Sequence, residues 1–201
     1  MNRKIYFLLI FFISIIFIAC DVFPTRIPED PSNPANNYIP PTTQNMLIEN
    51  FQSSINSADY NNYINCFSSK SNGQIKEFEF VPSGDVFNLY TSLFLNWHFT
   101  EETRNFKSIV SNISSDSKPN LNFSKKEFSE ISTDSTVFTA DYELNINLKE
   151  DSKLTLYSGK ILLNIYREPN GLWYISKWND VQSSNAGNFK TWSNLKVSNS
   201  N

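Results

Sequence analysis

The single histidine is the first residue to consider for catalysis in this sequence. His98 follows Trp97 near a predicted junction between helices. A histidine can act as a general base because its pKa lies near neutral pH. It can equally cap or pack against a helix end. We favour that second interpretation because no partner for His98 can be identified from the sequence.

A thiol and a pair of carboxylates are the next candidates. Cys66 lies on the flank of a predicted helical stripe and has no neighbouring histidine to activate a thiolate, so we expect a small buried side chain. Asp141 and Glu143 share one strand face, opposite Tyr142 and Leu144. Because polar and apolar residues alternate strictly there, we interpret these carboxylates as a solvated face rather than a catalytic pair.

Residues that bind metals or nucleic acids are scarce. One histidine, with no second cysteine near Cys66, gives no metal-ligand spacing. The formal net charge of −3 argues against nucleic acid as a partner, since phosphate binding needs a basic face. The sequence therefore predicts no metal, no cofactor and no set of catalytic residues.

Aromatic residues supply the remaining candidate site. They could line a hollow that takes a small apolar ligand, or they could simply form the core. The candidate pocket residues are Trp97, His98, Tyr142, Tyr157 and Trp173.

The N-terminus has the pattern of a secretory signal. Arg3 and Lys4 precede an apolar run of 14 residues, from Ile5 to Ile18. A helix that spans a membrane needs roughly 20 apolar residues, so this run favours a cleaved signal peptide over a permanent membrane span. We predict that residues 1–19 are removed.

The end of this run resembles the lipobox of bacterial lipoproteins. The sequence Phe17-Ile18-Ala19-Cys20 has a small residue before the cysteine and departs from the usual pattern at Phe17, where leucine is common. The resemblance implies a diacylglycerol on the Cys20 thiol and acyl chains such as palmitate. It places the protein in the bacterial cell envelope, lipid-anchored to the inner or outer membrane, with its domain outside the cytoplasm.

The segment 20–41 is predicted to be a tether between this anchor and a domain that occupies 42–201. Residues 21–41 contain six of the nine prolines of the chain and show neither helical nor strand periodicity. Proline fixes φ and removes backbone donors, so the segment should be extended and semi-rigid.

The domain begins with helical patterns. Thr42 or Thr43 can cap a first helix, and Asp59 can cap a second. A short strand at 78–81 precedes a helix that starts at Asp85 and runs to Trp97. A further helix starts at Thr100 and continues to about residue 113.

After Pro119 the hydrophobic period changes to two. Strands are predicted around 121–131 and at 136–148, 154–167 and 172–181. Helices first and an antiparallel meander last indicate an α+β fold in which helices pack on a strongly curved, mostly antiparallel sheet.

The last of these strands is aromatic on both sides if it is regular. Trp173 and Ile175 would face one way, and Tyr174 and Trp178 the other. Something must then cover the second face. The candidates are the C-terminal tail, with Phe189 and Trp192, or a second copy of the chain in a homodimer formed through the sheet.

This order of elements, closed by Gly-Leu-Trp-Tyr-Ile-Ser-Lys-Trp at 171–178, resembles the NTF2-like (SnoaL-like) cone fold. The tract 23–29 and the ending Thr191-Trp192-Ser193-Asn194-Leu195-Lys196 also resemble a group of bacterial lipoproteins that carry this domain. The superfamily contains isomerases, dehydratases and binding proteins, so the resemblance assigns no chemistry. We expect a non-enzymatic ligand-binding or protein-interaction module. The alternative is an isomerase or dehydratase that uses the cone pocket.

Overall fold

The computed structural model describes residues 38–149, 155–183 and 190–200. The predicted signal peptide, Cys20 and the predicted tether up to residue 37 lie outside the described residues, as does Phe189. No helix within the described ranges is long and apolar enough to cross a membrane.

Local side-chain caps start the two N-terminal helices. Helix α2 (Gln44–Asn56) begins after Thr43, whose hydroxyl accepts a hydrogen bond from the Met46 N–H at 3.2 Å. Helix α3 (Tyr60–Ile64) begins after Asp59, whose carboxylate accepts from the Asn62 N–H at 3.0 Å. Both predicted helix starts are confirmed, because a cap depends only on neighbouring residues.

The middle of the chain is more broken than predicted. A 3-10 turn η2 (Lys70–Asn72) leads to β1 (Glu79–Val81). The single helix predicted from Asp85 to Trp97 was wrong, because the chain forms two short helices, α4 (Gly84–Leu89) and α5 (Thr91–Phe94). Tyr90 separates them with a non-helical backbone, at φ −129° and ψ 38°. Helix α6 (Phe99–Asn112) follows.

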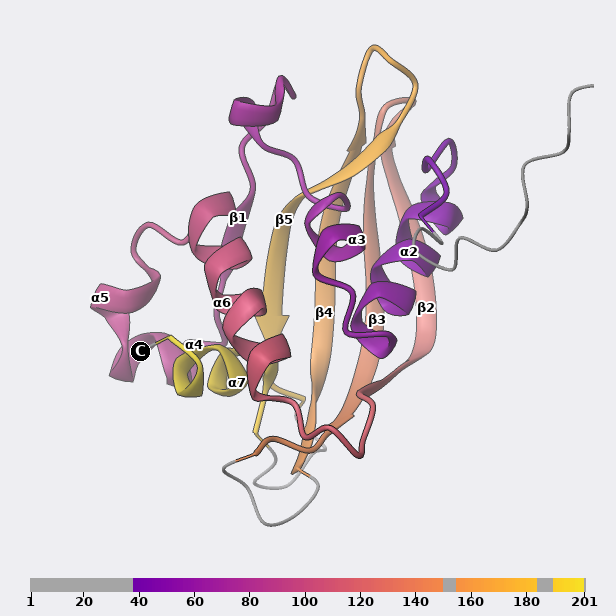
Figure 1. Ribbon diagram of the computed structural model, residues 1–201. Helices are drawn as coiled ribbons and strands as arrows, with labels where there is room; N and C mark the ends of the chain where they lie inside the picture. The colour runs from indigo at the N-terminus through magenta and orange to yellow at the C-terminus, as the bar shows by residue number, and fades with distance from the viewer. Residues whose placement is uncertain (1–37, 150–154, 184–189, 201) are drawn as a thin grey trace, which may run out of the picture. The chain divides into compact units, whose positions relative to one another are not determined.

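Five strands form one curved sheet with the order β1-β5-β4-β3-β2. Strands β2 (Asn120–Ser132), β3 (Ser135–Ile146), β4 (Thr155–Arg167) and β5 (Trp173–Val181) form an antiparallel meander, and β1 adds to β5 in parallel. The chain then enters helix α7 (Trp192–Ser198). Figure 1 shows α2, α3 and α6 in front of this sheet and α7 beneath α6. The predicted α+β class with a mostly antiparallel sheet is confirmed.

A bulge in the last pair of strands decides which way β5 presents its aromatic residues. Trp178 lies opposite Leu163, and Ile175 lies opposite Ile165, with a register shift between them. Leu163 and Ile165 are two residues apart and share a face, so Ile175 and Trp178 share that face too. The expectation that Trp178 points away from Ile175 was therefore wrong, because it assumed a regular strand.

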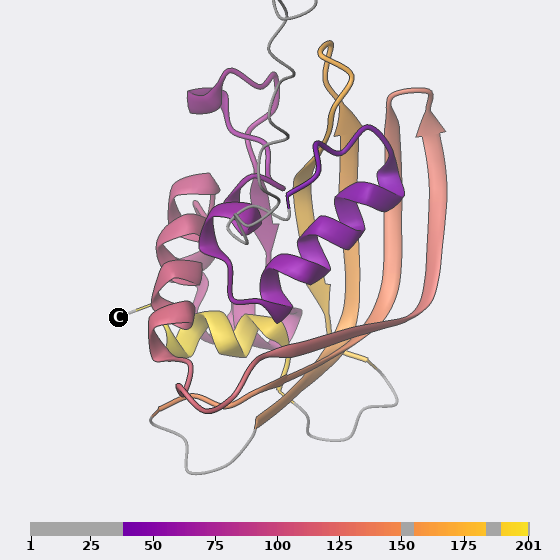
Figure 2. The same ribbon diagram turned by 45° about the vertical axis from the view of Figure 1, so that its right-hand side comes forward.

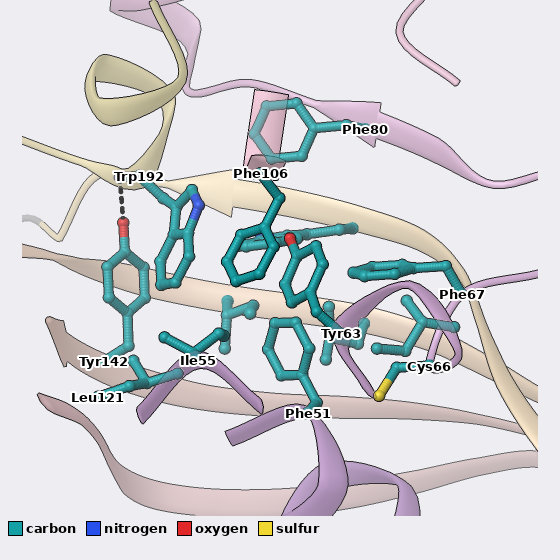
Figure 3. Packing of buried hydrophobic residues seen from close by; sticks show 14 of the residues in the cluster. Phe51, Ile55, Tyr63, Cys66, Phe67, Phe80, Phe106, Leu121, Tyr142 and Trp192 are labelled. Atoms are coloured by element: carbon teal, nitrogen blue, oxygen red, sulfur yellow. Dashed lines mark hydrogen bonds between the residues drawn. The ribbon is translucent and has the colours of Figure 1, made fainter. Parts of the chain in front are cut away.

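The core lies between the sheet and the helices on its concave side, where α2 crosses in front of the strands (Figure 2). Phe51 of α2 packs edge-on against Trp178 of β5 with ring centroids 5.5 Å apart. Tyr63 of α3 stacks on Phe106 of α6 at 3.5 Å, as Figure 3 shows. Phe51 also contacts Tyr63, with ring centroids 5.8 Å apart, so these rings join three helices to one sheet.

Contacts of the domain extend to the start of the described residues. The Tyr38 hydroxyl donates to the Asn65 carbonyl at 2.9 Å. The Asn50 side chain donates to the Ile39 carbonyl at 2.6 Å, and the Trp173 N–H donates to the Pro41 carbonyl at 2.9 Å. Residues 38–41, which we predicted as tether, are therefore fixed on the domain.

Gly159 permits the closest approach of side chain and backbone in the sheet. It pairs with Tyr142, and a Cβ on it would lie 2.7 Å from the Val181 carbonyl and 2.9 Å from the Tyr142 hydroxyl. Gly159→Ala should cost about 1–3 kcal/mol in the free energy of unfolding, because that backbone contact cannot relax cheaply.

Denaturant unfolding of the purified variants measures this cost. Gly84→Ala is the control, because a Cβ there meets nothing within 4 Å. We expect its free energy of unfolding to stay within about 0.5 kcal/mol of the parent. Equal stabilities for the two variants would contradict the packing described.

Candidate functional site

Helix α7 covers the concave face of the sheet, where the sequence predicted a pocket. The Trp192 ring lies 4.9 Å from Trp178 and 5.9 Å from Tyr142, measured between centroids. The Trp192 N–H donates to the Tyr142 hydroxyl at 2.7 Å, drawn as a dashed line in Figure 3. Trp192 and Leu195 are both buried. The C-terminal segment thus supplies part of the core.

A buried ion pair fixes this helix to α6. Lys196 of α7 is 1% exposed and Glu102 of α6 is 0% exposed. The Lys196 Nζ lies 2.5 Å from Glu102 Oε1 and 2.6 Å from Oε2. Two more donors reach the same carboxylate, the Tyr63 hydroxyl at 2.5 Å and the Trp97 indole N–H at 2.7 Å. The ammonium group thus neutralises a carboxylate that has no access to water, and four donor contacts in all satisfy its two oxygens.

Three aromatic rings complete the surroundings of the ammonium group. The Lys196 Nζ lies 4.4 Å from the Phe80 ring centroid, 4.8 Å from Trp178 and 5.3 Å from Trp97. All are within the range of cation–π attraction, which strengthens when the cation is desolvated.

The environment shifts the proton equilibria of this cluster. Burial lowers the pKa of Lys196, and the nearby Glu102 carboxylate opposes that change. Burial, together with the charge of Glu102, raises the pKa of the Tyr63 hydroxyl well above its ordinary value. Tyr63 therefore stays protonated and acts as a hydrogen-bond donor rather than as a base.

A second buried carboxylate holds the start of α7. Asp180 of β5 accepts from the Tyr142 hydroxyl at 2.8 Å and from the Ser193 N–H at 2.7 Å. The Ser193 hydroxyl also donates to it, at 2.5 Å. Burial raises the pKa of Asp180, although these hydrogen bonds oppose the increase. The result is a cap that fixes the α7 N-terminus to the last strand.

Both carboxylates are thus occupied by structural contacts. A general base must reach a substrate proton, and a buried acid with every oxygen already paired cannot do so without rearrangement. The described residues also contain no group of three potential metal ligands. The arrangement stabilises the position of α7 and presents no acid–base pair to a cavity.

The candidate pocket residues do not meet at one site. Trp97 contacts Glu102, whereas Tyr142 contacts Asp180 and α7. The other three residues lie apart. His98 is exposed at the start of α6, and its Nδ1 lies 3.1 Å from the Phe78 carbonyl. Tyr157 is buried on β4, and Trp173 is the first residue of β5.

Cys66 and the carboxylate pair lie where the strand and helix patterns placed them. Cys66 is a free, buried thiol whose Sγ contacts the Asn62 carbonyl at 3.3 Å, and burial raises its pKa. Asp141 is half-buried and pairs with Lys125 at 2.8 Å, and Glu143 is exposed. Cys66 is therefore part of the hydrophobic core, whereas Asp141 and Glu143 lie outside it.

Sequence reasoning missed the residues that build the buried clusters. Glu102 precedes Phe106 and Ile109 at i+4 and i+7 on the buried stripe of α6. Lys196 likewise occupies an apolar-stripe position, four residues after Trp192. A charged residue within a buried stripe could have indicated each of these positions. The pairing itself could not be predicted, because Glu102 and Lys196 are 94 residues apart in the sequence.

Comparison with known proteins rests on structure, because the sequence matches no known protein family and no curated protein. An NTF2-like superfamily protein from Salmonella enterica superposes with a TM-score of 0.51 and 14% identity, over 71% of this chain and 91% of its own. The domain has the NTF2-like fold.

Two other solved structures agree with this assignment. A ketosteroid isomerase-like protein from Erwinia carotovora atroseptica superposes with a TM-score of 0.50 and 12% identity, over 70% of this chain and 93% of its own. An NTF2-like protein from Rhodospirillum rubrum is described as of unknown function in nutrient uptake. It superposes with a TM-score of 0.51 and 8% identity, over 69% of this chain and 97% of its own. At these identities the likeness establishes the fold alone.

The ion pair makes a clear prediction for stability. Lys196→Met should lower the free energy of unfolding by about 3–5 kcal/mol, because it leaves the Glu102 carboxylate buried without a cation. The double variant Glu102→Gln/Lys196→Met should recover most of that loss, since no buried charge remains. Lys177→Met is the control, because its pair with Glu79 is solvent-exposed and should contribute less than about 1 kcal/mol. The account would be contradicted if denaturant unfolding gave Lys196→Met a loss in the free energy of unfolding as small as that of Lys177→Met.

The raised pKa of Asp180 predicts a pH dependence of stability. A carboxyl group whose pKa is higher in the folded state binds its proton more tightly there. It therefore favours folding below its unfolded pKa, which is about 3.8, and this contribution is lost as the pH rises through the raised folded value. Asp180→Asn cannot titrate. The stability of the parent relative to this variant should decrease from about pH 3.8 upward, as measured by thermal unfolding in a pH series. A constant or increasing difference would show that the pKa is not raised.

Proposed function

We propose that this protein is a lipid-anchored, non-catalytic binding module of the bacterial cell envelope. The leader, the lipobox-like sequence that ends at Cys20 and the proline-rich segment support the anchor. The observation that carries the non-catalytic part is the position of α7, which covers the concave face and engages the buried carboxylates of Glu102 and Asp180.

The isomerase or dehydratase alternative needs a free acid or base inside an enclosed cavity. The NTF2-like fold includes a ketosteroid isomerase-like protein, so the scaffold itself is compatible with that alternative. In this chain Glu102 accepts from Lys196 and Asp180 accepts from Ser193. The geometry therefore favours recognition at the outer surface over catalysis at the concave face.

One part of that surface is suited to a protein partner. Half of the eight large hydrophobic residues that are exposed in the described ranges lie within 87–95, and their exposed fractions run from 36% to 77%. They define the α4–α5 patch: Phe87, Leu89, Tyr90 and Leu95. A cleft of about 410 Å³ that includes Phe87 and Leu95 adjoins β1. The stretch 86–97 also contains no charged residue. Exposed apolar groups of this density mark interaction sites.

The anchor is tested by cell fractionation and mass spectrometry. The chain should be found with the membranes, and its N-terminal peptide should begin at an acylated Cys20. Cys20→Ser should remove the acyl mass and release the protein from the membrane fraction. An unmodified Cys20 peptide in the membrane fraction would overturn this part of the proposal.

The patch is tested by photo-crosslinking in cells that produce the protein. A crosslinking amino acid at Leu89 or Leu95 should give one discrete adduct whose partner is identified by mass spectrometry. Ile131 is the matched control, because it is 63% exposed but lies on β2, outside the patch. Adducts of equal yield at all three positions, or none at the patch, would contradict the assignment. An adduct with a second copy of the chain would identify a homodimer formed through the patch, instead of the dimer through the sheet that the sequence suggested.

A further inference from the structure

A small cleft lies at the junction of α6 and α7, where α7 lies beneath α6 (Figure 1). Its volume is about 150 Å³, and its walls include Leu93, Trp97, Glu101, Arg104 and Asn105. None of these residues belongs to the α4–α5 patch, so the cleft is a separate feature of the surface.

The cleft carries opposite charges that are not paired with each other. Glu101 and Arg104 are three residues apart on α6, yet no ion pair joins them, and Arg104 makes no ion pair elsewhere in the described ranges. One oxygen of Glu101 accepts from the His98 N–H at 3.2 Å. The other oxygen and the whole guanidinium group are available to a ligand.

A buried amide adds a polar group to the same wall. Asn105 is 4% exposed, and its Nδ2 donates to the Lys196 carbonyl at 2.9 Å and to the Ser200 hydroxyl at 3.0 Å. These two acceptors fix which end of the amide is the donor. The buried Asn105 Oδ1 then has no hydrogen-bond partner among the described residues. The Asn105 amide therefore joins the wall of the cleft to the end of α7.

The remaining walls are apolar. Leu93 is half-buried, and the Trp97 ring is buried apart from the part that faces the cleft. A cavity of similar volume lined by apolar side chains holds a molecule of the size of benzene. The cleft therefore has room for one small apolar group beside the charged side chains of Glu101 and Arg104.

We propose that this cleft binds a free α-amino acid with an apolar side chain. The carboxylate pairs with the Arg104 guanidinium, whose fork suits a planar carboxylate. The ammonium group donates to Glu101, and the side chain packs on Leu93 and Trp97. Since Trp97 also donates to Glu102, and Asn105 holds the Lys196 carbonyl, the occupied cleft stabilises the docked position of α7.

The test is calorimetric titration of the full-length chain in detergent with L-leucine as the probe. Leucinamide, which lacks the carboxylate, and N-acetyl-leucine, which lacks the ammonium group, are the matched ligands. L-leucine should bind with 1:1 stoichiometry and at least about tenfold more tightly than either derivative, because each lacks one charge-assisted contact.

Three variants on α6 separate the contributions of the two charges. Arg104→Ala should weaken L-leucine binding at least about tenfold and leave leucinamide unaffected. Glu101→Gln keeps an acceptor for the His98 N–H. It should weaken the binding of L-leucine and leave the binding of N-acetyl-leucine unchanged. Lys107→Ala is the control, since it removes an exposed cation from the same helix outside the cleft. It should leave the affinity for L-leucine unchanged.

Two results would overturn the proposal. One is the absence of binding up to about 10 mM L-leucine, an affinity too weak for a built site. The other is an equal loss of affinity in Arg104→Ala and Lys107→Ala, which would indicate attraction by net charge alone. Neither result bears on the membrane anchor or on the α4–α5 patch.

Discussion

The buried pair of Lys196 and Glu102 is the interaction on which the rest of this domain depends. It joins the last helix to α6 at 2.5 Å and lies inside a shell made of Tyr63 and two indole rings. Taking two charges out of water is costly, so the pair persists only because every oxygen of Glu102 has a donor. Removing either partner leaves a charge that no other described group neutralises.

This pair keeps α7 on the concave face of the sheet and so closes that face. In an open cone of this architecture the sheet and helices could enclose a ligand. Here the indole of Trp192 packs on Trp178 in that space, and Asp180 caps the helix that carries it. The two sites that we propose for recognition therefore lie on its outside, at the α4–α5 patch and at the cleft beside Arg104.

The sequence predicted the features that depend on neighbouring residues. The caps at Thr43 and Asp59 and the alternation along β3 are local, and the structure confirms them. The bulge that turns Trp178 toward the core depends on how β4 and β5 pair, which no local pattern specifies. The partners of Glu102 come from distant parts of the chain, so a charge in a buried stripe could be noticed but not assigned.

Hydrogen exchange at the backbone amides of α7 tests the closed concave face most directly. If the ion pair and the Asp180 cap hold this helix as described, its amides are released only by global unfolding. Their protection, measured by mass spectrometry at neutral pH, should then equal that of the amides in the central strand β4. Rapid exchange in residues 192–198, while β4 stays protected, would show that the helix detaches on its own and that the concave face opens.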